Sequence, residues 1–93
     1  MSHKFLVHAR EDSVGVAVED IQAGEMAEGI ILEGESIVTV KARQNIPLGH
    51  KIALVPLGAG EIVKKYGEAI GKAAAVINPG EHVHVHNLKS ARW

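Results

Sequence analysis

A short turn motif recurs four times along this chain and limits the folds that it can adopt. Each copy has an aliphatic residue, two spacers, a glycine and a polar residue, and a strand-like segment follows. The copies lie at residues 21–25, 46–50, 57–61 and 77–81. Glycine suits the positive-φ position of a tight turn, and Pro47 or Pro79 fixes φ at about −65° beside it. Because the spacing between copies is irregular, the motif does not indicate a solenoid. It predicts a mostly β domain of short strands joined by Gly/Pro turns.

The segments between these turns have the composition of β-strands. Val14, Val16 and Val18 alternate with smaller residues, which is typical of a strand with one bulky face. Further strands are predicted at residues 4–8, 29–32, 36–41, 51–55 and 82–87. Residues 33–35, Glu-Gly-Glu, are predicted to form a hairpin loop between two of them.

One segment, residues 61–76, fits two interpretations. Its apolar positions follow a helical spacing, which favours an amphipathic helix. However, Gly67 and Gly71 lie inside it, and each costs about 1 kcal/mol relative to alanine in a helix interior. We therefore predict strands at 62–65 and 70–76, with a turn at 66–68.

Size and composition set limits on function. The 93 residues are predicted to form a single domain, 1–93, with a core of aliphatic side chains, because 46% of residues are hydrophobic and only 3% are aromatic. A domain this small rarely encloses a substrate pocket, so we expect an active site to be completed by another chain or another copy.

Several classes of partner and location are disfavoured by the same composition. A net charge of −1 gives no electrostatic footprint for nucleic acid, and no run approaches the ~20 apolar residues of a membrane span. The absence of cysteine excludes disulfides, thiolate metal sites and cysteine nucleophiles. With no signal-peptide pattern at the start, a cytoplasmic location is expected.

The strongest functional signal is the run His82-Val83-His84-Val85-His86-Asn87. Side chains alternate across a strand, so the three imidazoles are predicted on one face and the valines on the other. Imidazole can ligate a metal, move a proton or hydrogen-bond an anion. Positions two apart on a strand are separated by roughly 6.6 Å, so at most two of these rings can share an ion. The alternative is an edge strand with a polar outer face.

Three other places are candidates for ligand contacts. His50-Lys51 follows a Pro/Gly turn and could clamp a carboxylate, or could simply be solvated; the same choice holds for Lys65-Tyr66 beside Gly67. Asn87 could fix a hydroxyl or carboxylate, or could end the strand as a turn residue. There is no phosphate loop, dinucleotide fingerprint or marked nucleophile, so the catalytic residues stay unknown.

These motifs resemble one family. The resemblance covers almost the whole chain, and its motifs are long and specific. They are Ile46-Pro47-Leu48-Gly49-His50-Lys51-Ile52-Ala53-Leu54, Val63-Lys64-Lys65-Tyr66-Gly67, Ile70-Gly71 and Gly80-Glu81-His82-Val83-His84-Val85-His86-Asn87. The chain resembles the small N-terminal SAF-type domain of the altronate/galactarate dehydratase family, which in some members is a separate small subunit of a two-chain hydro-lyase. The alpha subunit of the related sulfolactate sulfo-lyase is similar, even to the closing Arg92-Trp93.

The resemblance implies a β-clip fold and a large catalytic subunit that carries most of the active site. It also implies a divalent metal, iron or manganese, held mainly by that subunit. The implied reaction is elimination of water, or of sulfite in the sulfo-lyase, from a hydroxy-acid such as an aldonate or aldarate. The proton next to the carboxylate must leave while charge builds on the carboxylate oxygens, and a metal or cations would stabilise that charge.

The resemblance also suggests roles for individual residues. We expect His50, Lys51, Lys65, Tyr66 and Asn87 to contact the substrate, and His84 and His86, or alternatively His82, to lie at the metal. The general base is not assigned to this chain. A stand-alone module that binds sugar acids or metal, and an assembly domain whose histidines only pack at an interface, are the alternatives. Association into a homo-oligomer stays open.

Overall fold

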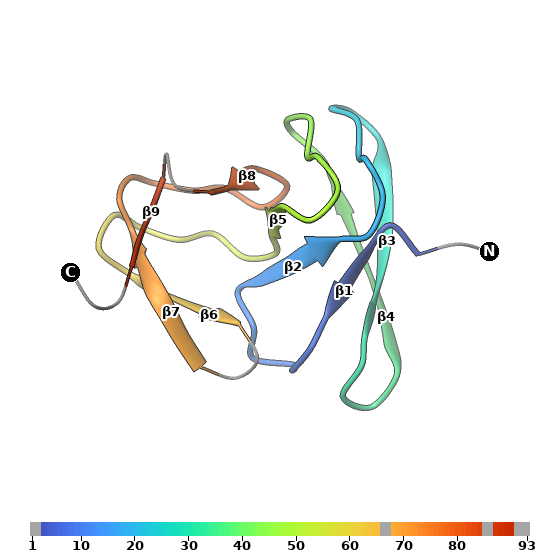
Figure 1. The fold of residues 1–93 in the computed structure, drawn as a ribbon, viewed down its shortest axis with the longest axis horizontal. Coiled ribbons are helices and arrows are strands. Elements are labelled where there is room, and N and C mark those ends of the chain that lie inside the picture. Colours follow the sequence, from blue (N-terminus) through green and yellow to red (C-terminus); the bar gives the residue numbers. More distant parts are fainter. Residues whose placement is uncertain (1–2, 66–67, 85–86, 91–93) are drawn as a thin grey trace.

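The computed structural model describes residues 3–65, 68–84 and 87–90, and every regular element in them is a β-strand (Figure 1). The strands are β1 (Phe5–Val7), β2 (Val14–Ala17), β3 (Met26–Ile31), β4 (Ser36–Lys41), β5 (Lys51–Ala53), β6 (Ile62–Lys65), β7 (Glu68–Ala73), β8 (His82–Val83) and β9 (Leu88–Ser90). The prediction of a mostly β domain is confirmed. Within these described ranges, no helix is long and apolar enough to cross a membrane.

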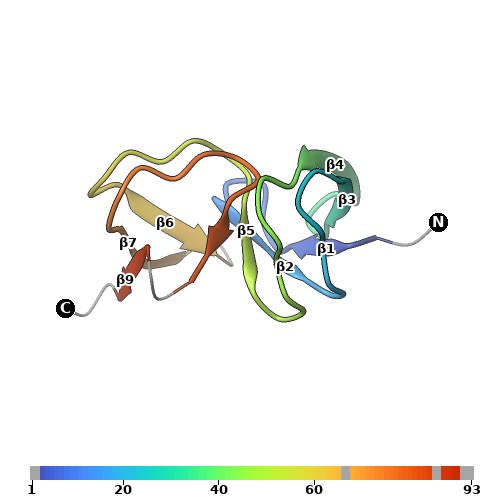
Figure 2. The ribbon, with the colours of Figure 1, turned by 90° about the horizontal axis from the view of Figure 1, so that it is seen from above.

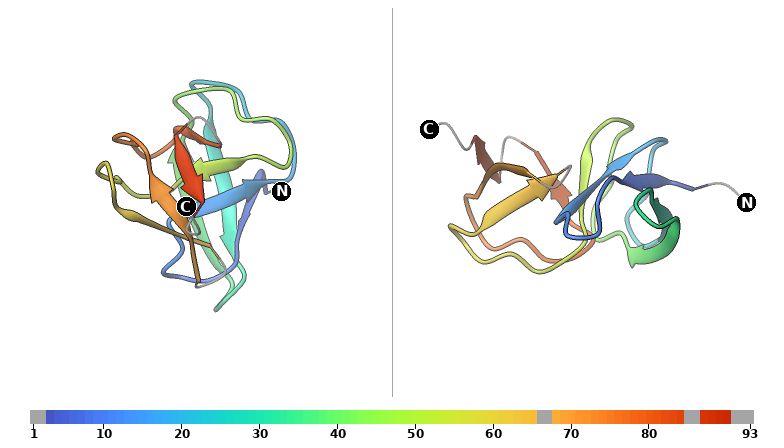
Figure 3. Two further views of the ribbon diagram at one scale, coloured as in Figure 1. Left: turned by 60° about the vertical axis from the view of Figure 1, so that its left-hand side comes forward. Right: turned by 90° about the horizontal axis from the view of Figure 1, so that it is seen from below.

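The strands form two sheets. The larger has the order β4-β3-β1-β2-β5-β8, in which β1 pairs parallel with β3 and the other pairs are antiparallel. The smaller has the order β6-β7-β9. Figures 2 and 3 show β6, β7 and β9 on one side of β5, with β1, β3 and β4 on the other. The strand β8 therefore lies at the edge of the larger sheet, where its residues can reach outward.

The recurring turns pair with one another, and each pair contributes its two aliphatic residues to one of the two hydrophobic cores. Gly24, Gly49, Gly60 and Gly80 all adopt positive φ, between 86° and 91°. Ile21 and Ile46 exchange backbone N–H···O bonds, as do Leu57 and Ile77. The first pair is buried with Phe5 and Ile52 in one core, and the second with Val63 and Val83 in the other. The turn prediction is confirmed, and the pairing explains why each copy begins with an aliphatic residue.

The ambiguous segment forms strands, as predicted. β6 and β7 pair antiparallel, with a register shift between Val63 and Lys64. Val63 and Ala73 are buried in the second core while neighbouring positions stay exposed, a period of two that a helix would not give. The second strand begins earlier than expected, at Glu68, and ends at Ala73. The turn residues 66 and 67 lie outside the described residues.

The predicted strand at 82–87 is confirmed for its first two residues and is wrong at His84 and Asn87. β8 ends at Val83, and the backbone N–H groups of Asn87 and Leu88 both donate to the carbonyl oxygen of His84, at 3.1 and 2.9 Å. The cause is local, because an asparagine side chain that bonds nearby backbone groups competes with the pairing of an edge strand. The turn leads into β9, and residues 85 and 86 lie outside the described part of the chain.

Candidate functional site

Three half-buried imidazoles meet at the edge of the larger sheet. Nδ1 of His50 lies 2.8 Å from Nε2 of His82, and the rings of His50 and His84 are stacked with centroids 4.2 Å apart. One nitrogen from each of His50, His82 and His84 lies within 4.8 Å of the other two. We call these three residues the imidazole cluster. The structure thus brings together two of the predicted metal ligands with a residue that was predicted to contact substrate.

His50 reaches the cluster because its turn differs from the other three. In those copies the final glutamate accepts a hydrogen bond from the backbone N–H three residues earlier. These bonds are Gln22 N to Glu25 Oε1 (2.7 Å), Gly58 N to Glu61 Oε1 (2.7 Å) and Asn78 N to Glu81 Oε1 (2.8 Å). The equivalent position in the remaining copy, at 46–50, is Pro47, which has no N–H to donate. A carboxylate at position 50 would therefore have no backbone N–H from which to accept this hydrogen bond. His50 turns instead towards His82.

His82 and His84 are held by two side-chain amides. The backbone N–H of His82 donates to Oε1 of Gln44 at 2.8 Å. Asn87 bridges the turn: its Oδ1 accepts from the N–H of His84 at 3.0 Å, and its Nδ2 donates to the carbonyl oxygen of His82 at 2.8 Å. Of the two roles considered for Asn87, the turn role is the one that these bonds describe. Gln44 was missed from the sequence, because a contact across 38 residues leaves no local pattern.

The nitrogen atoms of the cluster suit a divalent transition metal. Such a metal binds imidazole nitrogen at about 2.0–2.1 Å, so two nitrogens on one ion lie roughly 3–3.5 Å apart. The three nitrogens lie within 4.8 Å of one another, close to that spacing, and the 2.8 Å contact between His50 and His82 is a hydrogen bond that an ion would replace. The rings of His82 and His84 are nearly parallel, at 10°, and those of His50 and His84 at 24°. Since an imidazole lone pair lies in its ring plane, at least one ring must turn before three nitrogens can point at one ion.

Lys51 and Lys65 form a second group, on the other side of β5. Lys51 pairs with Val16 and Val83 across the ladder, whereas its neighbour Ile52 pairs with His82. Because successive residues of a strand face opposite sides, Lys51 and the cluster lie on opposite faces of β5. Burial lowers the pKa of Lys51, and the positive charge of Lys65 lowers this pKa further. Sequence adjacency of His50 and Lys51 therefore does not place them in one site.

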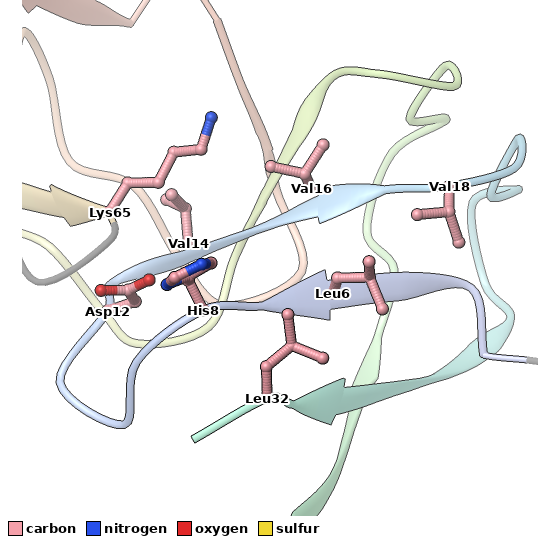
Figure 4. Close-up of a pocket in the computed structure, with 8 residues that line it drawn as sticks. All are labelled: Leu6, His8, Asp12, Val14, Val16, Val18, Leu32 and Lys65. Carbon is pink, nitrogen blue, oxygen red and sulfur yellow. The ribbon is translucent and has the colours of Figure 1, made fainter. Parts of the chain in front are cut away.

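Lys65 also lines an apolar groove on that second face. The groove has a volume of about 150 Å³ and is lined by Leu6, His8, Asp12, Val14, Val16, Val18, Leu32 and Lys65 (Figure 4). In the close-up, Leu6 projects from β1 and Leu32 from the residue that follows β3, and His8 lies beside Asp12 at one end. The buried Asp12 accepts a hydrogen bond from the N–H of Ala9 at 3.2 Å. Tyr66 and His86, also predicted as site residues, lie outside the described residues.

The fold and the cluster define a small all-β domain that presents three imidazoles and a separate pair of lysines. Residues 3–91 match the family described as the altronate/galactarate dehydratase SAF domain. The chain belongs to this family, which confirms the resemblance seen in the sequence motifs.

Both short subunits and much longer enzymes match the chain. It is 43% identical over 94 residues to the (2R)-sulfolactate sulfo-lyase subunit alpha of Chromohalobacter salexigens, with 100% of both chains covered. It is 37% identical to the altronate dehydratase of Bacillus subtilis and 42% identical to that of Escherichia coli, covering 92% and 90% of this chain. In both altronate dehydratases the match spans only 16% of the relative. The same domain therefore occurs as a short subunit and as a small part of a much longer chain.

Proposed function

We propose that this chain is the small subunit of a two-chain lyase that acts on a hydroxy-acid, with an active site completed by a large subunit. Two observations taken together carry the proposal. The chain matches a lyase subunit over that subunit's full length, and its structure brings three imidazoles together. The cluster offers ligands and hydrogen bonds, and we assign the remaining chemistry, including the general base, to the large subunit.

The length of the relatives favours sulfolactate as the first substrate to test. The sulfo-lyase subunit is matched along its whole length, whereas the altronate dehydratases are about six times longer than the matched part. A sugar-acid dehydratase is the second candidate, because the matched family is described by that activity and the altronate dehydratases reach 42% identity.

Both candidate reactions follow one scheme. A base takes the proton from the carbon beside the carboxylate, and the C–H electron pair is delocalised onto the carboxylate oxygens. The pair then forms a double bond to the next carbon as the bond from that carbon to the leaving group breaks; sulfite leaves with the bonding electrons, and hydroxide leaves together with a proton as water. The enol that remains tautomerises to a ketone. Negative charge grows on the carboxylate oxygens in the first step, so cationic groups aimed at them lower the barrier.

A divalent metal, iron or manganese, belongs to this proposal. When bound, it would act as a Lewis acid on the carboxylate and the leaving group. The residues of this chain that suit it are His50, His82 and His84. In the same proposal Asn87 is a positioning residue, since its amide holds the backbone of His82 and His84.

We retain Lys51 and Lys65 as residues that bind a carboxylate. Lys51 lies across β5 from the cluster, and Lys65, whose charge acts on Lys51, lines the apolar groove. The carboxylate comes either from the substrate, as predicted with Tyr66, or from the surface of the large subunit. Replacing Lys65 with Met separates these sources: a substrate contact raises KM in the assembled enzyme, whereas a partner contact weakens subunit association at unchanged KM.

The apolar groove supports the expectation of a large partner. Val18 and Leu32, at 41% and 46% exposure, leave apolar surface uncovered on a sheet whose other face is filled by the first core. We propose that the large subunit covers this groove, because the longer relatives carry most of their length beyond the matched domain.

The test is reconstitution. The chain and its candidate large subunit are purified separately and mixed, and (2R)-sulfolactate, altronate and galactarate are supplied in turn, with sulfite and 2-oxo acid measured as products. We expect turnover only in the mixture, with sulfite released from sulfolactate. Turnover by the large subunit alone at the same rate would overturn the subunit role. Turnover of altronate without any of sulfolactate would replace the first candidate with the second.

A further inference from the structure

The imidazole cluster contains a ligand that the strand pattern could not supply. On an extended strand, alternate histidines are spaced too widely for more than two to share an ion. In the structure the third imidazole comes instead from the turn at 46–50, with His50 and His82 separated by 32 residues in sequence. Three nitrogens thus converge within 4.8 Å without any ligand from another chain.

The surroundings hold the backbone of His82 and His84 in place, so that only the rings must turn to meet an ion. Gln44 fixes the backbone of His82, and Asn87 fixes both His82 and His84. Pro47 removes the donor that a glutamate at position 50 would cap. In metal sites, hydrogen bonds from the ligand rings to neighbouring groups orient the ligands, and their loss typically lowers metal affinity 10–100-fold. Here the bonds act one step further out, on the backbone that carries the rings of His82 and His84.

The ligand atoms also indicate which ions suit the site. Imidazole nitrogen suits iron, zinc, copper and nickel, whereas carboxylate and carbonyl oxygen suit manganese, magnesium and calcium. The cluster offers three imidazoles, and all three rings are only half-buried. Further coordination positions can therefore face outward, where water, a substrate or a partner residue can fill them.

We propose that this chain binds one divalent transition metal by itself, through His50, His82 and His84, with the remaining coordination positions open. This goes beyond the proposed function, since it needs neither the large subunit nor a substrate. It differs from the expectation that the large subunit holds the metal, and from the pair His84 and His86. The set of three imidazoles favours iron over manganese.

The experiment titrates the tag-free chain with Co²⁺, because the visible absorption of Co²⁺ reports its ligands. Calorimetry on the same samples gives the stoichiometry and affinity. We expect one Co²⁺ per chain, with absorption typical of nitrogen ligands. His50→Gln, His82→Gln and His84→Gln should each weaken binding by about a hundredfold or more, while the matched control His3→Gln leaves it unchanged. Mn²⁺ should bind more weakly than Co²⁺.

Two further measurements keep the result interpretable. Circular dichroism and thermal melting show whether each variant is folded without metal, and in the unmodified chain the ¹⁵N signals of the imidazoles of His50, His82 and His84 should respond to Zn²⁺ together. Loss of Co²⁺ binding in His86→Gln with retention in His50→Gln would overturn the assignment in favour of the pair seen from sequence. Absence of saturable binding by the unmodified chain would overturn it outright, while leaving the lyase subunit role to the reconstitution test.

Discussion

Nδ1 of His50 approaches Nε2 of His82 to 2.8 Å, so one of these nitrogens donates a proton and the other accepts it. This single contact joins a turn at one end of β5 to the edge strand β8. It exists because position 50 carries histidine where three equivalent turns carry glutamate, and because Pro47 has no N–H for a glutamate to cap.

A double-mutant cycle at Pro47 and His50 tests this explanation. His50→Glu alone should gain no capping bond, because position 47 offers no donor. In the background of Pro47→Gln, the same His50→Glu change should create the bond seen in the other turns and add about 1 kcal/mol to the free energy of unfolding. Denaturant unfolding of the four proteins measures the coupling. Equal effects of His50→Glu in both backgrounds would show that Pro47 does not control the role of position 50.

Much of the fold follows from local pattern, and the site does so only in part. The glycine of each turn and the alternating valines of β2 predict short strands, since φ preference and a period of two act within a few residues. Likewise, Gly67 and Gly71 correctly argue against a helix at 61–76. These features need no knowledge of which strands pair.

The imidazole cluster, in contrast, cannot be predicted without knowing which strands pair. His82 and His84 draw attention in the sequence, but the position of His50 beside them is set by pairing of β5 with β8. Conversely, His50 and Lys51 are neighbours in sequence, and strand alternation sends the lysine to the opposite face. The end of β8 at Val83 is decided by the side-chain bonds of Asn87, which compete with strand pairing and which a residue pattern alone does not reveal.

Replacing Asn87 with Ala should loosen the cluster. Two side-chain hydrogen bonds to the backbone are lost, which lowers the free energy of unfolding by about 1–2 kcal/mol. If Asn87 positions His82 and His84, Co²⁺ affinity should also fall about tenfold or more. Denaturant unfolding and Co²⁺ titration of one preparation measure both effects.

Asn45 provides the matched control for that change. Its Oδ1 accepts a hydrogen bond from the N–H of Ala23 at 2.8 Å, in the turn at 21–25. Asn45→Ala should cost stability without changing Co²⁺ affinity. Asn87→Asp, which keeps an acceptor for the N–H of His84, should restore part of the affinity. An Asn87→Ala variant that is less stable but binds Co²⁺ normally would leave Asn87 a purely structural role.

Removing the charge of Lys51 should stabilise the isolated chain. The pKa of Lys51 is lowered because burial and the charge of Lys65 disfavour its protonated form in the folded protein, so this charge costs stability at neutral pH. Since Lys51 is only partly buried, solvent screening limits the gain from Lys51→Met to roughly 0.5 kcal/mol. Thermal melting at pH 7 measures it against Lys64→Met, an exposed control on β6. A lower melting temperature for Lys51→Met than for the control would contradict this account of Lys51.

Charged substitutions in the apolar groove test whether the large subunit covers it. Val18→Asp and Leu32→Asp place a carboxylate on apolar surface that the large subunit is proposed to cover, so an unpaired charge would be buried in the complex. Both side chains are exposed in the isolated chain, so folding should survive. We expect association with the large subunit to weaken about tenfold or more, measured by calorimetry or co-elution.

Val55→Asp is the matched control, since Val55 is the same residue type as Val18, has the same exposure of 41%, and lies outside the groove. It should associate normally. The Co²⁺ affinity of Val18→Asp and Leu32→Asp should equal that of the unmodified chain, because the cluster lies across β5 from the groove. Normal association of both Val18→Asp and Leu32→Asp would exclude the groove as the docking surface and would place the partner on another face, most directly the edge formed by β8, where the imidazoles themselves would become the contact.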